Sequence, residues 1–197
     1  KISIFFKVSD KDGSPVPGLT ANQFTIYEQG RNDACFNTIS TSESNARISP
    51  NSQIFNNNTV LVLDLSNSVL SSSLDELKSA SVSFINSVMP ENTNDSFKMA
   101  IYWFDGENKL HDLEPLTASK TELIAAIEGI TNSISKDPST DLYGAVIKST
   151  DIAEKLLQES TKNNNIGAAS VVIFTDGTDQ ASRYTQSDAL KKVDNAN

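Results

Sequence analysis

The sequence predicts an α/β domain built on a doubly wound, mostly parallel sheet with helices on both faces. Three observations support this prediction. From Thr59 onwards, short apolar strands alternate with segments of helical period, which is typical of parallel sheets. The strands carry consecutive apolar residues, as expected for strands buried on both faces. Residues 1–45 instead alternate in strand fashion between turns, so a small all-β, sandwich-like segment is predicted to precede the α/β domain.

The amino-terminal segment is predicted to hold three strands. Alternation of apolar and polar side chains over residues 2–9 predicts the first strand. Turn-forming residues follow, with Asp12-Gly13 as the expected tight turn. Two further strands are predicted over residues 23–30 and 34–40, of which the second has the weaker pattern.

Residues 46–57 are rich in Ser and Asn and are predicted to be a linker, and residues 58–197 are predicted to form the α/β domain. Its elements are expected in this order: a strand over 59–66, a helix over 74–88, a strand over 97–106, a short strand over 108–117 that pairs back on it, helices over 123–130 and 142–157, a strand over 169–177, and a helix from 187 that is capped by Ser187 or Asp188. A doubly wound sheet normally continues after such a helix, so the last strands of the domain are expected to lie beyond Asn197.

Composition narrows the range of partners. Sixteen basic and twenty-five acidic residues give a net charge of −9, which disfavours binding to nucleic acid phosphates and favours cations. No apolar run approaches the ~20 residues of a membrane-spanning helix, so no direct membrane insertion is expected. The single cysteine, Cys35, allows neither an internal disulfide nor a cysteine zinc site, and it is expected to be a small buried residue.

Polar residues follow two of the buried strands directly, where a parallel sheet binds ligands. Asp64 and Asp176 come immediately after apolar runs, and Ser66 and Ser68 lie two residues apart in the loop after Asp64. Thr140 is supplied by a polar loop before a helix, where it could also serve as the N-cap. Two carboxylates and three hydroxyls make a hard oxygen site that suits Mg²⁺, or alternatively Mn²⁺ or Ca²⁺, better than zinc or copper.

Other interpretations of Asp64 fit less well. A phosphatase of the haloacid dehalogenase type needs a second carboxylate two residues on, and that position is Ser66. Another phosphoryl-transfer protein using Asp64, the phospho-acceptor receiver domain, needs paired acidic residues before the acceptor strand and a lysine on a late strand, and the sequence shows neither. A Ser-His-Asp hydrolase is disfavoured because the only histidine, His111, is expected to face solvent on an edge strand. A metal-free structural scaffold is a third alternative. The sequence therefore favours a binding module over an enzyme.

The spaced motifs resemble those of the von Willebrand factor A domain, which is also called the integrin I domain. The resemblance rests on Asp64-x-Ser66-x-Ser68, on the threonine of the segment 140–143 and on Thr175-Asp176-Gly177, and it covers residues 58–197. It implies a Rossmann-like fold and a metal-ion-dependent adhesion site. Ser66 and Ser68 would then bind the metal directly, whereas Asp64, Thr140 and Asp176 would act directly or through water.

The resemblance also implies a partner and a location. In this family the metal completes its coordination with a carboxylate from a protein ligand, so a Glu or Asp side chain of a partner is expected. Residues 10–30 resemble the small β-rich segment that precedes A domains in secreted bacterial proteins. Together with few lysines and many Ser, Thr and Asn residues, this indicates an extracellular, cell-surface or periplasmic location.

Overall fold

The computed structural model describes residues 8, 11, 23–39, 55–92, 95–163 and 166–196. The chain divides into two compact units, Lys1–Gln53 and Ile54–Asn197. Within the larger unit the first strand begins at Phe55, three residues before the predicted start of the α/β domain.

The described residues of the small unit include a short antiparallel hairpin. Its strands are β1 (Tyr27–Glu28) and β2 (Asn37–Thr38), so the second and third predicted strands exist but are only two residues long. The first predicted strand and the Asp12-Gly13 turn lie outside the described residues. Cys35 is exposed, and the prediction that it is buried is wrong. The described part of this hairpin is exposed almost throughout, so it offers Cys35 no core.

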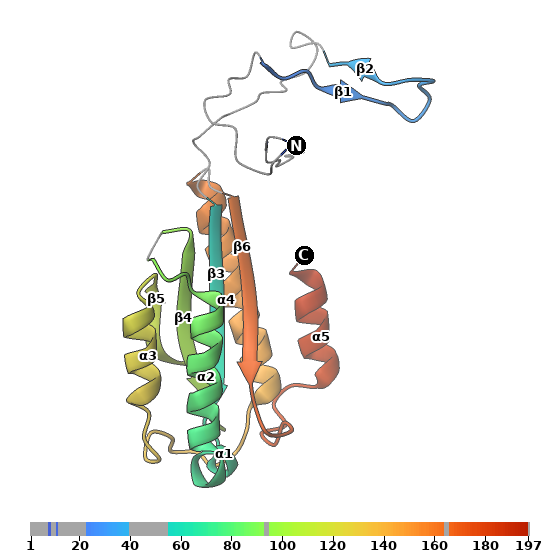
Figure 1. Ribbon diagram of the computed structural model, residues 1–197. Helices are drawn as coiled ribbons and strands as arrows, with labels where there is room; N and C mark the ends of the chain where they lie inside the picture. Colours follow the sequence, from blue (N-terminus) through green and yellow to red (C-terminus); the bar gives the residue numbers. More distant parts are fainter. Residues whose placement is uncertain are drawn as a thin grey trace. The chain divides into compact units, whose positions relative to one another are not determined.

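A four-stranded sheet forms the centre of the large unit (Figure 1). Its strands are β3 (Phe55–Asp64), β4 (Phe97–Phe104), β5 (His111–Thr117) and β6 (Ile166–Phe174). The strand order is β5-β4-β3-β6, in which β3 runs parallel to both β4 and β6, and β5 returns antiparallel to β4. This arrangement confirms the predicted mostly parallel sheet and the strand that pairs back on its predecessor.

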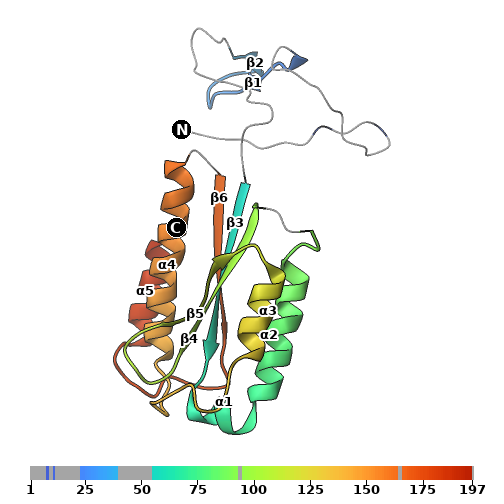
Figure 2. The ribbon, with the colours of Figure 1, turned by 90° about the vertical axis from the view of Figure 1, so that its left-hand side faces the viewer.

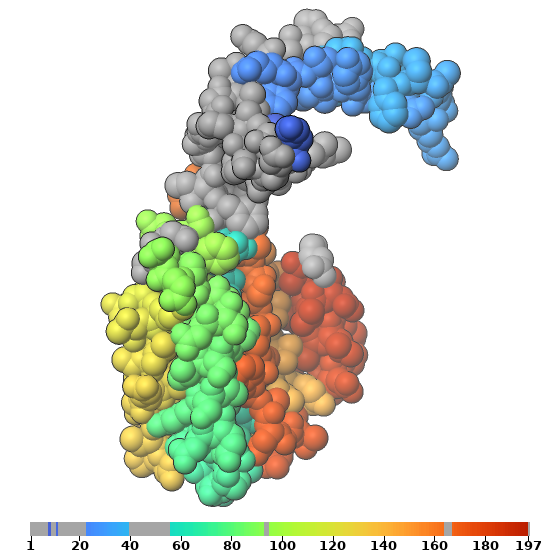
Figure 3. Space-filling view, in the orientation of Figure 1, coloured from blue at the N-terminus to red at the C-terminus, as the bar shows by residue number. Residues whose placement is uncertain are grey.

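Helices cover both faces of the sheet, as Figure 2 shows. They are α1 (Asn67–Ser72), α2 (Leu74–Val88), α3 (Lys120–Glu128), α4 (Leu142–Lys162) and α5 (Gln186–Asn195). The helices α2 and α3 lie side by side on one face (Figure 3), whereas α4 packs on the other face and contacts α5. No helix among the described residues is both long enough and apolar enough to cross a membrane.

The apolar run of β3 is explained by this double cover. Leu61 and Leu63 pack into the core beneath α2 and α3, whereas Val60 and Val62 pack with Ala145 of α4. All four β3 residues have no exposed surface. Because successive side chains of a strand point to opposite faces, a strand covered on both sides must be apolar at every position.

Two helix starts differ from the predictions. The cap of α5 is Thr185, whose hydroxyl accepts from the Asp188 N–H while the Asp188 carboxylate accepts from the Thr185 N–H. Asp188 is thus the third helical residue of a capping box rather than the cap. The N-cap of α4 is Asp141 and not Thr140. The short α1 was not predicted, since its six residues include only two apolar side chains, Val69 and Leu70, which are adjacent and show no helical period.

His111 is not solvent-facing as predicted. Its ring stacks on Trp103 at 3.7 Å between centroids, and its side chain is only 17% exposed. The strand register explains the difference, because His111 lies directly opposite Trp103, so that both side chains share the core face of the sheet. Trp103 and the adjacent Phe104 are themselves buried.

Candidate functional site

Asp64 is the fixed point of the site. It ends β3 with no exposed surface, and both of its carboxylate oxygens are engaged. One oxygen accepts from the backbone N–H of Ser66 at 2.9 Å, and the other accepts from the Thr175 hydroxyl at 2.6 Å. The first bond fixes the start of the loop that carries the two serines. The second ties Asp64 to the end of β6 and fixes the relative positions of the two strand ends.

The two serines lead from this buried carboxylate to the surface. Ser66 is buried and Ser68 is exposed, and their hydroxyl oxygens lie 3.3 Å apart. The Ser68 hydroxyl in turn donates to Asp176 at 3.2 Å. Asp176 is exposed, in the loop that follows β6. Four of the five predicted residues therefore form a continuous polar chain at the carboxyl ends of β3 and β6.

Thr140 reaches the same place through its backbone. The Asn67 N–H, between the two serines, donates to the carbonyl of Pro138 at 3.1 Å. The Thr140 carbonyl accepts from the N–H groups of Gln180 and Ala181 at 2.8 and 3.1 Å. The loop that carries Thr140 is thus held between the loop after β3 and the loop after β6. Among the described residues, no hydrogen bond joins the buried Thr140 side chain to the other four predicted residues.

Asp105 supports the Thr140 loop from the end of β4. Its carbonyl accepts from the Asp141 N–H at 2.9 Å, and its fully buried carboxylate accepts from the Ser135 hydroxyl at 2.7 Å and from the Glu107 N–H at 2.9 Å. Burial alone would raise the pKa of Asp105, but these hydrogen bonds and a further one from Asp137 outweigh it and hold the pKa below its usual range. Asp105 therefore holds the 135–141 loop as an ionised group.

Two residues of this arrangement were missed by sequence reasoning. Thr175 has a signal, because it lies between a buried strand and Asp176 at the predicted site edge. Its contact with Asp64 nevertheless depends on the pairing of β6 with β3, which the sequence does not specify. Asp105 comes directly after the apolar run of β4, as Asp64 comes after that of β3, and this position was its signal.

The donor chemistry fits a hard divalent cation. Two neutral serine hydroxyls and two carboxylates are brought together at the carboxyl ends of β3 and β6, and Ser68 and Asp176 are open to solvent. Such a set of oxygen groups suits Mg²⁺, Mn²⁺ or Ca²⁺ and leaves room for water and an external ligand.

Comparison with known proteins establishes the family. The family model of the von Willebrand factor type A domain matches residues 59–178, which is more than half of the chain. The chain belongs to this family. Domains of the von Willebrand factor A family are in general interaction modules rather than enzymes. None of the curated proteins compared with the chain matches it.

Solved structures share the fold at low sequence identity. The proximal thread matrix protein 1 of the mussel byssus is 14% identical with a TM-score of 0.51, covering 72% of this chain and 36% of its own. A structure of the same mussel protein with a zinc-occupied MIDAS motif gives a TM-score of 0.50 at 14% identity, covering 73% of this chain and 37% of its own. The von Willebrand factor domain of the type V pili tip protein Mfa5 from Porphyromonas gingivalis is 17% identical, with a TM-score of 0.49, covering 70% of this chain and 44% of its own. The chain thus spans less than half of these proteins.

Proposed function

We propose that the chain is a metal-dependent protein-binding or adhesion module, in which a divalent cation coordinates a carboxylate from a partner protein. The observation that carries the proposal is the convergence of Ser66, Ser68 and Asp176 on the anchored carboxylate of Asp64, at the edge of the sheet. The proposed metal ligands are Asp64, Ser66, Ser68, Thr140 and Asp176. When bound, the cation would supply an electrophilic position for the acidic side chain of the partner.

The protein residues have distinct parts in this proposal. Asp64 cannot rotate freely, because Ser66 and Thr175 hold both of its oxygens. Its carboxylate therefore orients the Ser66 loop and supplies negative charge to a bound cation from the buried side of the site. Ser68 and Asp176 lie on the exposed side, where an incoming carboxylate must arrive. Neutral serine hydroxyls leave more positive charge on a cation than carboxylates would, and this favours an acidic partner.

The preferred cation is Mg²⁺, with Mn²⁺ or Ca²⁺ as alternatives. The mussel protein is described with zinc at its MIDAS motif, so zinc belongs among the cations tested. We propose an extracellular, cell-surface or periplasmic location, in keeping with the β-rich segment and the polar composition. An enzymatic role is not part of the proposal, and neither is binding to nucleic acid.

Thermal melting with and without metal tests the cation site. Wild type should melt higher in Mg²⁺ or Mn²⁺ than in chelator, since a ligand at about 100 times its Kd stabilises the native state by about 2.7 kcal/mol. The exposed Asp176→Ala should lose most of this shift at little cost to the metal-free protein. Ser87→Ala is the matched control, because among the described residues the exposed Ser87 hydroxyl donates only to the carbonyl of Ser83 on α2. A wild type that melts at the same temperature in metal and chelator would refute the cation site.

A peptide array tests the partner chemistry separately. Random peptides containing one Glu, paired with Gln versions, are probed with the chain in Mg²⁺ and in chelator. Binding should require both Glu and Mg²⁺ and should be lost in Asp176→Ala. Binding that persists in chelator would contradict a metal-bridged contact. Turnover of p-nitrophenyl phosphate should not exceed background, and turnover abolished by Asp64→Asn would replace the binding module with the phosphatase alternative.

A further inference from the structure

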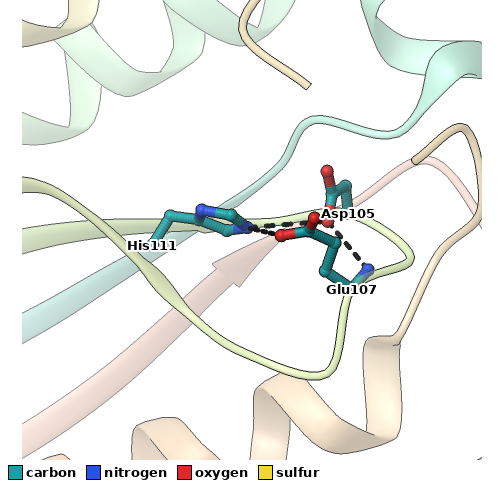
Figure 4. Close-up of side chains that lie close together, drawn as sticks. All are labelled: Asp105, Glu107 and His111. Carbon is teal, nitrogen blue, oxygen red and sulfur yellow. Dashed lines mark hydrogen bonds and ion pairs between the residues drawn. The ribbon is translucent and has the colours of Figure 1, made fainter. Parts of the chain in front are cut away.

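Three metal-ligating side chains lie together in the β4–β5 hairpin, separate from the five residues above. Asp105 follows β4, Glu107 lies in the connecting loop and His111 begins β5 (Figure 4). The Nε2 atom of His111 lies 3.3 Å from a carboxylate oxygen of Glu107 and 3.6 Å from one of Asp105. One ligand atom from each residue lies within 4.8 Å of the other two.

The imidazole is held firmly in this position. It stacks on Trp103 with an angle of 9° between the rings, so that its edge, and not its face, is turned to the carboxylates. Asp105 is equally fixed, because hydrogen bonds from Ser135 and Glu107 engage both of its oxygens. Glu107 is the most exposed of the three and also pairs with Lys109 at 2.8 Å. The cluster is thus pre-organised by contacts that do not depend on a metal.

The His111 nitrogen has no hydrogen-bond partner. Its Nε2 atom is buried from solvent, and within the described residues it meets no donor or acceptor at hydrogen-bond geometry. It nevertheless faces two carboxylate oxygens. A bare nitrogen lone pair directed at two carboxylates is unfavourable. Either a proton on Nε2, as in the neutral Nε2–H tautomer or in imidazolium, or a metal ion must therefore lie between them.

The separations match a coordination site. Zinc binds imidazole nitrogen and carboxylate oxygen at about 2.0–2.2 Å in tetrahedral geometry, which places neighbouring ligand atoms about 3.3–3.6 Å apart. The distances from His111 to Glu107 and to Asp105 fall in that range. One imidazole with two carboxylates is a donor set of intermediate softness, suited to Zn²⁺ and similar transition metals rather than to Mg²⁺.

We propose that Asp105, Glu107 and His111 form a second metal site, which takes Zn²⁺ or a similar divalent transition-metal ion. The site shares no ligand with the proposed adhesion site and does not rest on it. It differs in donor chemistry, since it has a nitrogen ligand and no hydroxyl. Three protein ligands leave a position for water, on the side where Glu107 is exposed.

Zinc titration of matched variants tests this site. The starting protein is the full chain without a histidine tag, carrying Ser68→Ala and Asp176→Ala to remove zinc binding at the adhesion site. Calorimetry should give one Zn²⁺ per chain. His111→Gln and Glu107→Gln should each weaken binding by at least the ~10–100-fold that even outer-shell changes cost. Asp112→Asn, an exposed neighbour of His111, should leave the affinity unchanged.

The single histidine provides a direct spectroscopic readout. Because His111 is the only imidazole of the chain, its ring nitrogens can be followed by NMR without assignment ambiguity. Addition of Zn²⁺ should shift the Nε2 signal to that of a metal-bound nitrogen, and excess Mg²⁺ should not reverse the shift. A protonated Nε2 that does not respond to Zn²⁺ would show an ion pair instead and overturn the proposal. Zinc affinity that is unchanged in Glu107→Gln, which is partly exposed and so should fold, would overturn it as well.

Discussion

The two clusters of this domain are built in opposite ways. The Asp64 cluster joins oxygen groups after β3 and after β6 through hydrogen bonds between residues 108 and 111 positions apart in sequence, and its outer members are exposed. The Asp105 cluster takes two carboxylates and an imidazole from one hairpin of seven residues. The first depends on the packing of the sheet, whereas the second depends on a local turn and one cross-strand ring contact.

This difference predicts how substitutions in each cluster should affect stability and ligand binding. Residues that join distant segments contribute both to the free energy of unfolding and to ligand binding, so changes there affect both quantities. Residues of a local hairpin can be exchanged with smaller effects on folding. Asp105 stands between the two cases, because it belongs to the hairpin in sequence but holds the loop of Thr140, through its carbonyl at Asp141 and through its carboxylate at Ser135.

The largest effect is expected for Asp64→Ala. It removes the acceptor of the Ser66 N–H and of the Thr175 hydroxyl, and it leaves two donors without their partner. The free energy of unfolding should fall by about 2–4 kcal/mol, and stabilisation by Mg²⁺ should disappear. Urea denaturation with and without Mg²⁺ measures both quantities.

Asp64→Asn separates the two contributions. The asparagine oxygen can still accept from Ser66, and its amide can donate to the Thr175 oxygen. The cost in chelator should therefore be roughly half of the alanine value or less, while the response to Mg²⁺ is still lost with the charge. Equal destabilisation by alanine and asparagine would show that these two hydrogen bonds do not anchor the site.

Gly106→Ala should have a smaller effect than the Asp64 variants, but it should weaken metal binding at both clusters. A Cβ atom at this position would lie 2.2 Å from a carboxylate oxygen of Asp137 and 2.7 Å from the Cβ of Ser139. Both residues belong to the loop that leads to Thr140, and Gly106 itself lies between two ligands of the Asp105 cluster. The loop must shift, so the affinities for Mg²⁺ and for Zn²⁺ should both fall about 10-fold or more, measured by calorimetry.

Gly177→Ala is the control for the glycine variant. It lies beside Asp176, but nothing comes within 4 Å of an added Cβ atom there. Both metal affinities should stay at their wild-type values. If Gly106→Ala also left them unchanged, the 137–139 segment would have no part in positioning either cluster.

The sequence allowed the fold and the first cluster to be predicted for the same physical reason. Asp64 ends the apolar run of β3 and Asp176 lies in the loop after the apolar run of β6, and the ends of these parallel strands meet at one sheet edge. This prediction requires only the order of the strands and helices along the chain. The contact of the Thr175 hydroxyl with Asp64 could not be predicted in this way, because it depends on the pairing of β6 with β3.

The second cluster could not be predicted because it depends on strand register. Alternation along an edge strand indicates two faces but not which face is covered. Only the pairing of His111 with Trp103 places the ring on the core side. The same limit applies to α5, where Thr185 caps the helix two residues before the expected Ser187. The face on which His111 lies and the cap residue of α5 both depend on local backbone geometry, and the sequence is compatible with more than one such geometry.

The smallest loss of stability is expected for Thr185→Ala. The capping box of Thr185 lies at the start of α5 and contains no proposed metal ligand, so this substitution should change stability without changing metal binding. Hydrogen bonds from the Thr185 hydroxyl and N–H lower the pKa of Asp188. A lowered carboxyl pKa contributes stability above the usual Asp range, and this stability is lost as pH falls through the lowered value. At neutral pH the substitution should lower Tm by about 2–4 °C, with both metal affinities unchanged. The difference from wild type should shrink in acid, when Asp188 is protonated in both proteins. A Tm difference that stays constant down to acid pH would show that the ionised Asp188 does not contribute through this cap.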